Sequence, residues 1–237
     1  MKDLKKLLKI KKKDIISITG SGGKTSLMEK LGEELKEDGR VLMTTSTKIL
    51  RPTNPKIDYV FDSFDSYKKP REKKVLVAMG NLDPTSNKLG GLLEEDLEKI
   101  KDDFDYILIE ADGCRNLPLK MWKSYEPVIY NISTKVVSVF SAKVLGRKIK
   151  EDFIYNFEDF KSLVGEGLVD KEVFLKLITN KPGPFGDFKG EKIVFFNQVD
   201  SKEEKYEIDK LIKYLRKNIE GIRYISGSLL KEEYYED

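Results

Sequence analysis

The sequence predicts an α/β fold, a mostly parallel sheet flanked by helices. Two observations carry this prediction. Short apolar runs alternate with amphipathic helical stretches, and strands separated by helices pair in parallel. The first apolar run also leads into a glycine-rich segment and then into a helical pattern. Because no internal repeat or low-complexity linker interrupts the 237 residues, we expect a single domain over residues 1–237 with a short N-terminal helix.

The segment over residues 15–26, IISITGSGGKTS, is typical of a phosphate-binding loop. Glycines let successive N–H groups point at an anion, and the following helix adds its dipole. Lys24 is expected to reach the β- and γ-phosphates, and Thr25 to bind Mg²⁺. Ile18 stands where the pattern GxxxxGK[ST] has its first glycine, so the loop resembles the shorter form of the Mur ligase central domain. The fold is therefore predicted to be P-loop NTPase-like, although glycine-rich turns also serve purely structural roles. The predicted phosphate-binding residues are Gly20, Ser21, Gly22, Gly23, Lys24, Thr25 and Ser26.

A second predicted strand, residues 40–45, ends in a run of hydroxyl side chains, TTST. The carboxyl edge of an open parallel sheet is where ligands bind. Threonine also favours strands for its shape alone, so a structural role is the alternative. The predicted ligand-binding residues of this run are Thr44, Thr45 and Thr47.

A buried strand over residues 106–109 delivers two carboxylates, Glu110 and Asp112, to the same edge. An apolar strand ending in a carboxylate is the Walker B arrangement, which orders Mg²⁺ or its water shell. We therefore predict Thr25, Glu110 and Asp112 as metal ligands and Lys24, Glu110 and Asp112 as catalytic residues. The IEADG segment also resembles the glutamate motifs of metallochaperone GTPases.

The strand that begins at residue 193 runs into NQVD, residues 197–200, which resembles the guanine-reading NKxD motif. Asn197 and Asp200 are the predicted base contacts, and Gln198 replaces the lysine of that motif. The nucleotide is thus ATP or GTP, with Mg²⁺ as the metal. A strand ending in a polar turn is the structural alternative.

The rest of the chain divides by the same patterns. Helices are predicted at 1–13, 26–38, 92–101, 155–164, 171–179 and 201–218, and further strands at 58–61, 74–79, 135–140 and 222–225. Residues 80–91, 116–130 and 181–192 are predicted to lack regular structure.

Composition excludes several functional classes. With no histidine and one cysteine, the chain lacks the residues of a zinc site, a Ser-His pair or an internal disulfide. A net charge of +3 with interleaved lysines and acidic residues predicts a solvated surface and no nucleic-acid partner. No run is long enough to span a bilayer and no signal peptide is visible, so we expect a cytoplasmic protein with no membrane partner.

The ordered motifs ISITGSGGKTSLM, GRVLMTTSTKI, DYILIEADGCRNLPLK, YEPVI, VLGRKI and FFNQVD resemble the YqeC family over nearly the whole chain. This resemblance implies a nucleotide-binding accessory protein of selenium-dependent molybdenum hydroxylases, acting in maturation or insertion of their cofactor. A molybdenum hydroxylase or its cofactor-loading machinery is then the implied partner. In addition to the loop and threonine residues, the resemblance points to Glu110, Asp112, Gly113, Pro118, Lys120, Glu126 and Pro127. Tyr125 stands where the family has histidine.

Three functional hypotheses remain open at this stage. The first is a Mg²⁺-dependent NTPase or phosphoryl-transfer enzyme that delivers a cofactor or metal to a client. The second is a nucleotide-sensing scaffold without significant turnover. The third is a small-substrate kinase or ligase, for which this chain lacks the separate substrate domains of the Mur enzymes. The sequence leaves open whether two copies form a homodimer across the nucleotide.

Overall fold

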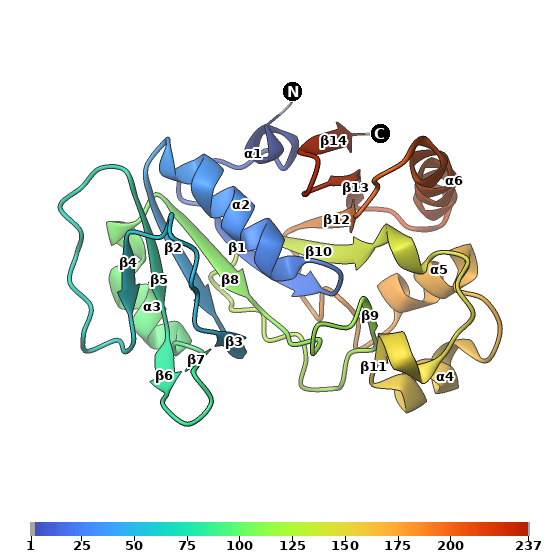
Figure 1. The fold of residues 1–237 in the computed structure, drawn as a ribbon, viewed down its shortest axis with the longest axis horizontal. Coiled ribbons are helices and arrows are strands. Elements are labelled where there is room, and N and C mark those ends of the chain that lie inside the picture. Colours follow the sequence, from blue (N-terminus) through green and yellow to red (C-terminus); the bar gives the residue numbers. More distant parts are fainter. Residues whose placement is uncertain (1–2, 237) are drawn as a thin grey trace.

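One sheet of nine strands runs through the molecule in this computed structural model, which describes residues 3–236 (Figure 1). Neighbouring strands are parallel except for the last pair, β13 and β14. The predicted mostly parallel α/β fold is thus confirmed. In spatial order the strands are β14 (Glu233–Glu236), β13 (Ile222–Ser228), β12 (Glu191–Asn197), β10 (Lys135–Ser141), β1 (Ile15–Gly20), β8 (Tyr106–Glu110), β2 (Arg40–Thr45), β5 (Val75–Met79) and β4 (Tyr59–Phe61).

Helices cover both faces of the sheet because buried side chains alternate along each strand. In β1, Ile16 and Ile18 face the cluster that contains α1 and α2, whereas Ile15 faces the cluster of α3. Helices α4, α5 and α6 pack on the same face as α3, against β10 and β12. Their bounds are α1 (Leu4–Leu7), α2 (Lys24–Lys36), α3 (Glu94–Ile100), α4 (Phe157–Val164), α5 (Lys171–Thr179) and α6 (Lys202–Asn218). Short 3₁₀ turns lie at η1 (Lys101–Asp103), η2 (Ala142–Val144) and η3 (Glu151–Phe153).

The longest helix, α6, shows how the local sequence sets an element. The Ser201 side chain accepts from the Glu204 N–H and the Glu204 side chain accepts from the Ser201 N–H, a capping box that fixes the first turn. The buried residues of α6 recur at helical spacing and form one stripe: Ile208, Leu211, Ile212 and Leu215. This helix matches the prediction for residues 201–218.

A second, three-stranded sheet begins just after the carboxyl end of β2. It consists of β3 (Lys48–Leu50), β7 (Lys88–Gly90) and β6 (Asn81–Asp83), all antiparallel. The prediction that residues 80–91 are a loop is therefore wrong. Its strands are three residues long, and only the central residues of β3 and β7, Ile49 and Leu89, are buried, so the apolar signal is minimal.

Other boundaries differ from the predictions at the chain ends and in the irregular segments. The helix predicted at 1–13 is a single turn, and Met1 and Lys2 lie outside the described residues. Helix α2 begins at Lys24, two residues before its predicted start. Two strands of two residues each, β9 (Leu119–Lys120) and β11 (Ile154–Tyr155), pair with each other and were not predicted. The edge strand β14 was not predicted either.

Candidate functional site

The glycine loop connects β1 to α2 at the carboxyl edge of the central strands. Gly20, Gly22 and Gly23 have φ angles of +94°, +85° and +124°, which side chains other than glycine rarely adopt. A Cβ on Gly20 would lie 2.2 Å from the Val139 carbonyl oxygen. The loop thus brings its backbone against β10 and turns directly into the N-terminus of α2, where the first N–H groups have no partner within the helix.

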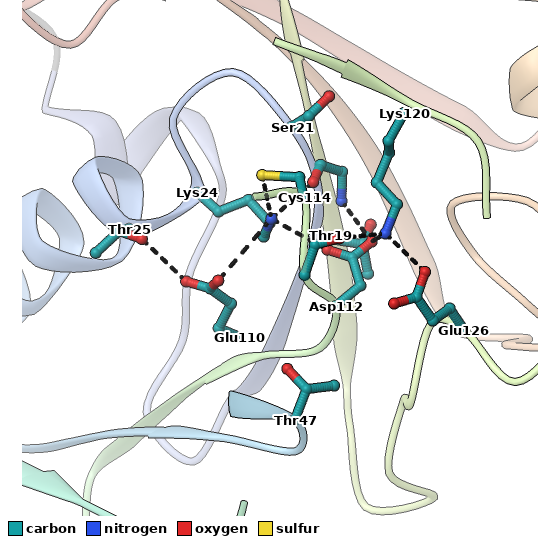
Figure 2. Close-up of polar contacts among 12 residues, drawn as sticks. Thr19, Ser21, Lys24, Thr25, Thr47, Glu110, Asp112, Cys114, Lys120 and Glu126 are labelled. Carbon is teal, nitrogen blue, oxygen red and sulfur yellow. Dashed lines mark hydrogen bonds and ion pairs between the residues drawn. The ribbon is translucent and has the colours of Figure 1, made fainter. Parts of the chain in front are cut away.

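The Lys24 ammonium lies under this loop, with its side chain 2% exposed (Figure 2). Its Nζ donates to the Gly20 carbonyl oxygen at 2.7 Å and to Cys114 Sγ at 3.3 Å. It also pairs with Asp112 Oδ1 at 3.2 Å and with Glu110 Oε1 at 3.9 Å. Burial lowers the pKa of Lys24, but the charges of Asp112 and Glu110 outweigh it and raise the pKa above its ordinary value. Lys24 is therefore a fixed positive charge.

Asp112 is fully buried and bound on both oxygens by protein groups. Oδ2 accepts from the Gly20 N–H at 2.9 Å and from Trp122 Nε1 at 2.6 Å. Oδ1 forms the ion pair with Lys24 Nζ but accepts no hydrogen bond within the described residues. Asp112 thus ties the start of the glycine loop to the core, and it does not line the adjoining cavity.

Lys120 is a second buried ammonium behind Asp112, and the residue patterns alone did not single it out. Its Nζ donates to the Gly113 carbonyl oxygen at 2.6 Å and to Glu126 Oε2 at 2.9 Å, and it lies 3.3 Å from Asp112 Oδ2. Figure 2 shows the resulting chain of charges, Glu110, Lys24, Asp112, Lys120 and Glu126. Opposite charges alternate along it, which is how buried charges are tolerated.

Glu110 ends β8 and faces the first turn of α2. Thr25 Oγ1 donates to Glu110 Oε2 at 3.1 Å, so the hydroxyl and the carboxylate predicted to hold a metal do meet. Burial raises the pKa of Glu110, and the Lys24 ammonium offsets only part of that effect. No group of three or more Cys, Asp or Glu side chains with metal-binding geometry occurs in residues 3–236.

Most of the remaining hydroxyl side chains predicted at this edge form hydrogen bonds with the main chain. Thr44 Oγ1 donates to the Met79 carbonyl oxygen and Thr45 Oγ1 to that of Glu110, both at 2.8 Å, and both threonines are fully buried. Thr47 donates its N–H to Thr45 Oγ1. Ser21 is also buried and bonds to the Pro118 carbonyl oxygen, whereas Ser26 is exposed. Of these five residues, only Ser26 lines a cavity at the loop.

The end of β12 reaches the glycine loop from the other side. Asn197 Nδ2 donates to the Gly22 carbonyl oxygen at 2.9 Å, and Asn197 Oδ1 accepts from the Leu229 N–H at 3.1 Å. Asp200 lies one turn further on, where Oδ1 accepts from Ser228 and Oδ2 pairs with Lys143 Nζ at 3.0 Å. The Ser228 hydrogen bond and the Lys143 charge lower the pKa of Asp200. Asn197 thus supports the loop, whereas both carboxylate oxygens of Asp200 are engaged by Ser228 and Lys143.

Two adjoining cavities follow the loop and share Gly23, Ser26 and Gln198 in their walls. The larger, of about 530 Å³, is lined by Gly22 to Ser26, Glu110 and residues 113–118 among others. The smaller, of about 460 Å³, contains Asn197, Asp200, Ser228 and Lys143. Five of the predicted loop residues, Gly22 to Ser26, therefore lie with Glu110, Asn197 and Asp200 around two adjoining cavities. Gly20 and Ser21 line neither cavity.

Several residues of this region carried little signal in the sequence. Cys114 has no histidine near it in the sequence to mark it as a functional thiol, yet its sulfur accepts a hydrogen bond from Lys24 Nζ. Ser141 ends β10 and donates to Gln198, and the rule that ligands gather at carboxyl strand ends could have identified it. Trp122 lies in a segment without periodicity, so nothing in the sequence pointed to its bond with Asp112.

No helix within residues 3–236 has both the length and the apolar character needed to cross a bilayer.

The profile of the YqeC protein family matches residues 16–158 of the chain. The uncharacterized protein YqeC of Escherichia coli (strain K12) is 26% identical over 217 residues, which cover 88% of this chain and 85% of that protein. Among solved structures, the apo crystal structure of a GTPase from Pyrococcus abyssi aligns with a TM-score of 0.36 and 12% identity, covering 93% of this chain and 92% of the other. That TM-score is too low to support any structural inference.

Proposed function

The chain belongs to the YqeC family, and we propose that it binds a nucleoside triphosphate with Mg²⁺ at the glycine loop and hydrolyses it. One observation carries this proposal. The loop of residues 20–23 opens, at the N-terminus of α2, onto a cavity whose wall also contains Glu110, hydrogen-bonded to Thr25. Strand, glycine loop, Lys-Thr and a facing strand-end carboxylate together match the needs of a metal–triphosphate.

The loop and Lys24 would hold the phosphates. The free N–H groups at the start of α2 and the helix dipole favour an anion there. The Lys24 ammonium would exchange its 3.3 Å contact with Cys114 Sγ for a phosphate oxygen while keeping Asp112 and the Gly20 carbonyl behind it. In the transition state of hydrolysis, this fixed charge would stabilise the negative charge that develops between the β- and γ-phosphates.

Thr25 and Glu110 fit the metal better than Asp112 does. Mg²⁺ keeps several waters and takes one or two protein oxygens beside the phosphates, so one hydroxyl and one carboxylate suffice. Bound Mg²⁺ would neutralise phosphate charge as a Lewis acid. Asp112 is engaged by Gly20, Trp122 and two lysines, and we assign it the role of a positioning residue for the loop.

The smaller cavity would take the base, and ATP and GTP remain the two candidates. Guanine recognition by Asp200 would have to displace Lys143 and Ser228, which now occupy both carboxylate oxygens. Asn197 contributes by bracing the loop through Gly22.

The cellular role follows from the family resemblance. We propose an accessory factor in maturation or insertion of the selenium-containing molybdenum cofactor of hydroxylases, with the hydroxylase or its loading machinery as partner. Nucleotide turnover would gate delivery to that client.

Thermal melting of the full chain with ATP or GTP, each with and without Mg²⁺, tests the binding proposal. Ligand at a hundred times its Kd stabilises the native state by about 2.7 kcal/mol, which corresponds to roughly 5–10 °C for a chain of this size. The shift should need Mg²⁺ and should disappear in Lys24→Ala. Absence of any shift with either nucleotide would contradict the proposal.

Phosphate release measured on the same samples tests hydrolysis. Glu110→Gln should lower turnover well below wild type, while Glu98→Gln, at a surface ion pair with Lys101, should not. Tight binding with only background release in wild type would favour the nucleotide-sensing scaffold.

A further inference from the structure

Three cations from outside the glycine loop and α2 line the larger cavity. Lys48 and Lys88 come from β3 and β7 of the small sheet, and Arg115 comes from the turn after β8. With Lys24 they make four cationic side chains, whereas Glu110 is the one carboxylate among the lining residues. Glu110 already faces Thr25 and Lys24, so it does not pair with the other three cations.

The geometry of the small sheet places the two lysines on one face. Leu50 of β3 is paired with Lys88 of β7, and Lys48 lies two residues before Leu50, on the same side of the strand. Ile49 and Leu89, on the opposite side, are buried. The strand alternation therefore anchors the hairpin by one face and presents both ammonium groups on the other.

Within residues 3–236, neither Lys88 nor Arg115 has an ion-pair partner within 4 Å, and the pair between Lys48 and Asp83 is long, at 3.7 Å. Asp83, on β6, is also the residue opposite Lys88, so this single carboxylate stands beside both lysines. By contrast, many exposed lysines elsewhere in the chain pair with carboxylates at 3 Å or less, such as Lys56 with Glu33 at 2.7 Å. An excess of one sign of charge around a concave surface raises the local concentration of counter-ions. This part of the cavity is thus set to attract an anion.

Arg115 is held by its backbone and by an aromatic ring. Arg115 and Asn116 have φ angles of +49° and +60°, unusual for residues other than glycine. The Arg115 guanidinium lies 5.4 Å from the centre of the Tyr155 ring, and Tyr155 lines the same cavity. A cation–π contact uses none of the N–H groups as hydrogen-bond donors to a carboxylate, so they stay available for a bidentate contact with a phosphate.

We propose that Lys48, Lys88 and Arg115 form a second anion subsite, which binds the phosphate group of a small-molecule substrate beside the nucleotide. The inference rests on the proposed function, because the loop, Lys24 and Mg²⁺ already match the nucleotide's own phosphates. A phosphorylated small molecule is the class of acceptor or cargo that this arrangement of one guanidinium and two ammonium groups recognises.

Calorimetry with inorganic pyrophosphate as the probe tests the subsite. The full chain is first saturated with Mg²⁺ and a non-hydrolysable ATP or GTP analogue, and pyrophosphate is then titrated. Wild type should bind one further pyrophosphate. Lys88→Glu and Arg115→Glu should each weaken that second event by about ten- to a hundredfold, as expected for loss of a charge-assisted hydrogen bond. Analogue affinity should change by less than about threefold.

Lys213→Glu is the matched control, because Lys213 is exposed on α6, lines neither cavity at the loop and gives the same change in net charge. It should leave both binding events unchanged. No second event in wild type, or a second event that Lys88→Glu and Arg115→Glu leave intact, would overturn the subsite. So would loss of analogue affinity in both variants, because the cations would then serve the nucleotide.

The two proposals fail in different ways. If wild type binds neither nucleotide analogue, the proposed function is wrong. Pyrophosphate binding that still depends on Lys88 and Arg115, but not on Lys213, would then support the anion subsite by itself.

Discussion

Replacing Asp112 by asparagine removes the negative charge between two buried ammonium groups. Lys24 Nζ and Lys120 Nζ lie 3.2 and 3.3 Å from its oxygens, and neither lysine side chain is more than 2% exposed. Removing one partner of a buried ion pair costs about 3–5 kcal/mol. Because Glu110 and Glu126 remain near the two lysines, we expect a loss at the lower end, about 3 kcal/mol in the free energy of unfolding. The amide oxygen can still accept from the Gly20 N–H.

Urea unfolding followed by circular dichroism measures this loss, and a double-mutant cycle assigns its cause. Lys120→Met removes one of the two ammonium groups that face position 112, so the double variant should be more stable than the sum of the single losses predicts, by about 1 kcal/mol or more. Asp96→Asn, at the surface ion pair with Lys99, should cost at most about 0.5 kcal/mol. A loss below about 1 kcal/mol for Asp112→Asn, or strict additivity, would refute the charge-chain argument.

Three further predictions concern the backbone and the core. Gly20→Ala should lower the free energy of unfolding by about 2 kcal/mol or more in thermal melts, because the added Cβ would clash with the Val139 carbonyl. Gly146→Ala is the control: its Cβ would have no neighbour within 4 Å, and the loss should be about 1 kcal/mol or less. The buried hydroxyl of Tyr224 has no hydrogen-bond partner within residues 3–236, and burial raises the pKa of Tyr224 to about 12 from 10.0. The unfolded chain therefore releases this proton first, so stability should fall as pH rises from 10 to 12, and Tyr224→Phe should reduce that fall without loss at pH 7. Asn116→Gly should leave the free energy of unfolding unchanged or raise it by up to about 1 kcal/mol, because it relieves a φ of +60°; a clear loss in urea unfolding would contradict this.

Long apolar strands were predictable because burial on both faces leaves a continuous hydrophobic run. Strands β1, β8 and β10 lie in the sheet interior, and each is buried at every position. The small sheet was missed for the converse reason, since its three-residue strands bury one side chain or none. Strand β14 carries mostly polar residues at the edge and depends on pairing with β13.

Some residues of the candidate site could likewise be predicted from the sequence and others could not. The glycine loop and Glu110 were predictable because each follows directly from a strand end in the sequence. The role of Asp112 was not, because it is set by Trp122 and Lys120, which lie in a segment without regular periodicity. Likewise, nothing in the TTST run shows that Thr44 and Thr45 bond to the main chain of neighbouring strands.

The position of β1 has a consequence for how the chain folds. This strand is the first of the main sheet in sequence, yet its neighbours come much later: Ile15 pairs with Ile107 and Ile16 with Lys135. Contacts between residues so far apart in sequence give a high contact order, and such topologies fold slowly because large loops must close first. During synthesis, β1 and the loop after it stay without β8 until residues as far as Ile107 have been made, and without β10 until residues as far as Lys135 have been made. The glycine loop is thus encoded near the start of the chain and completed among its late folding events.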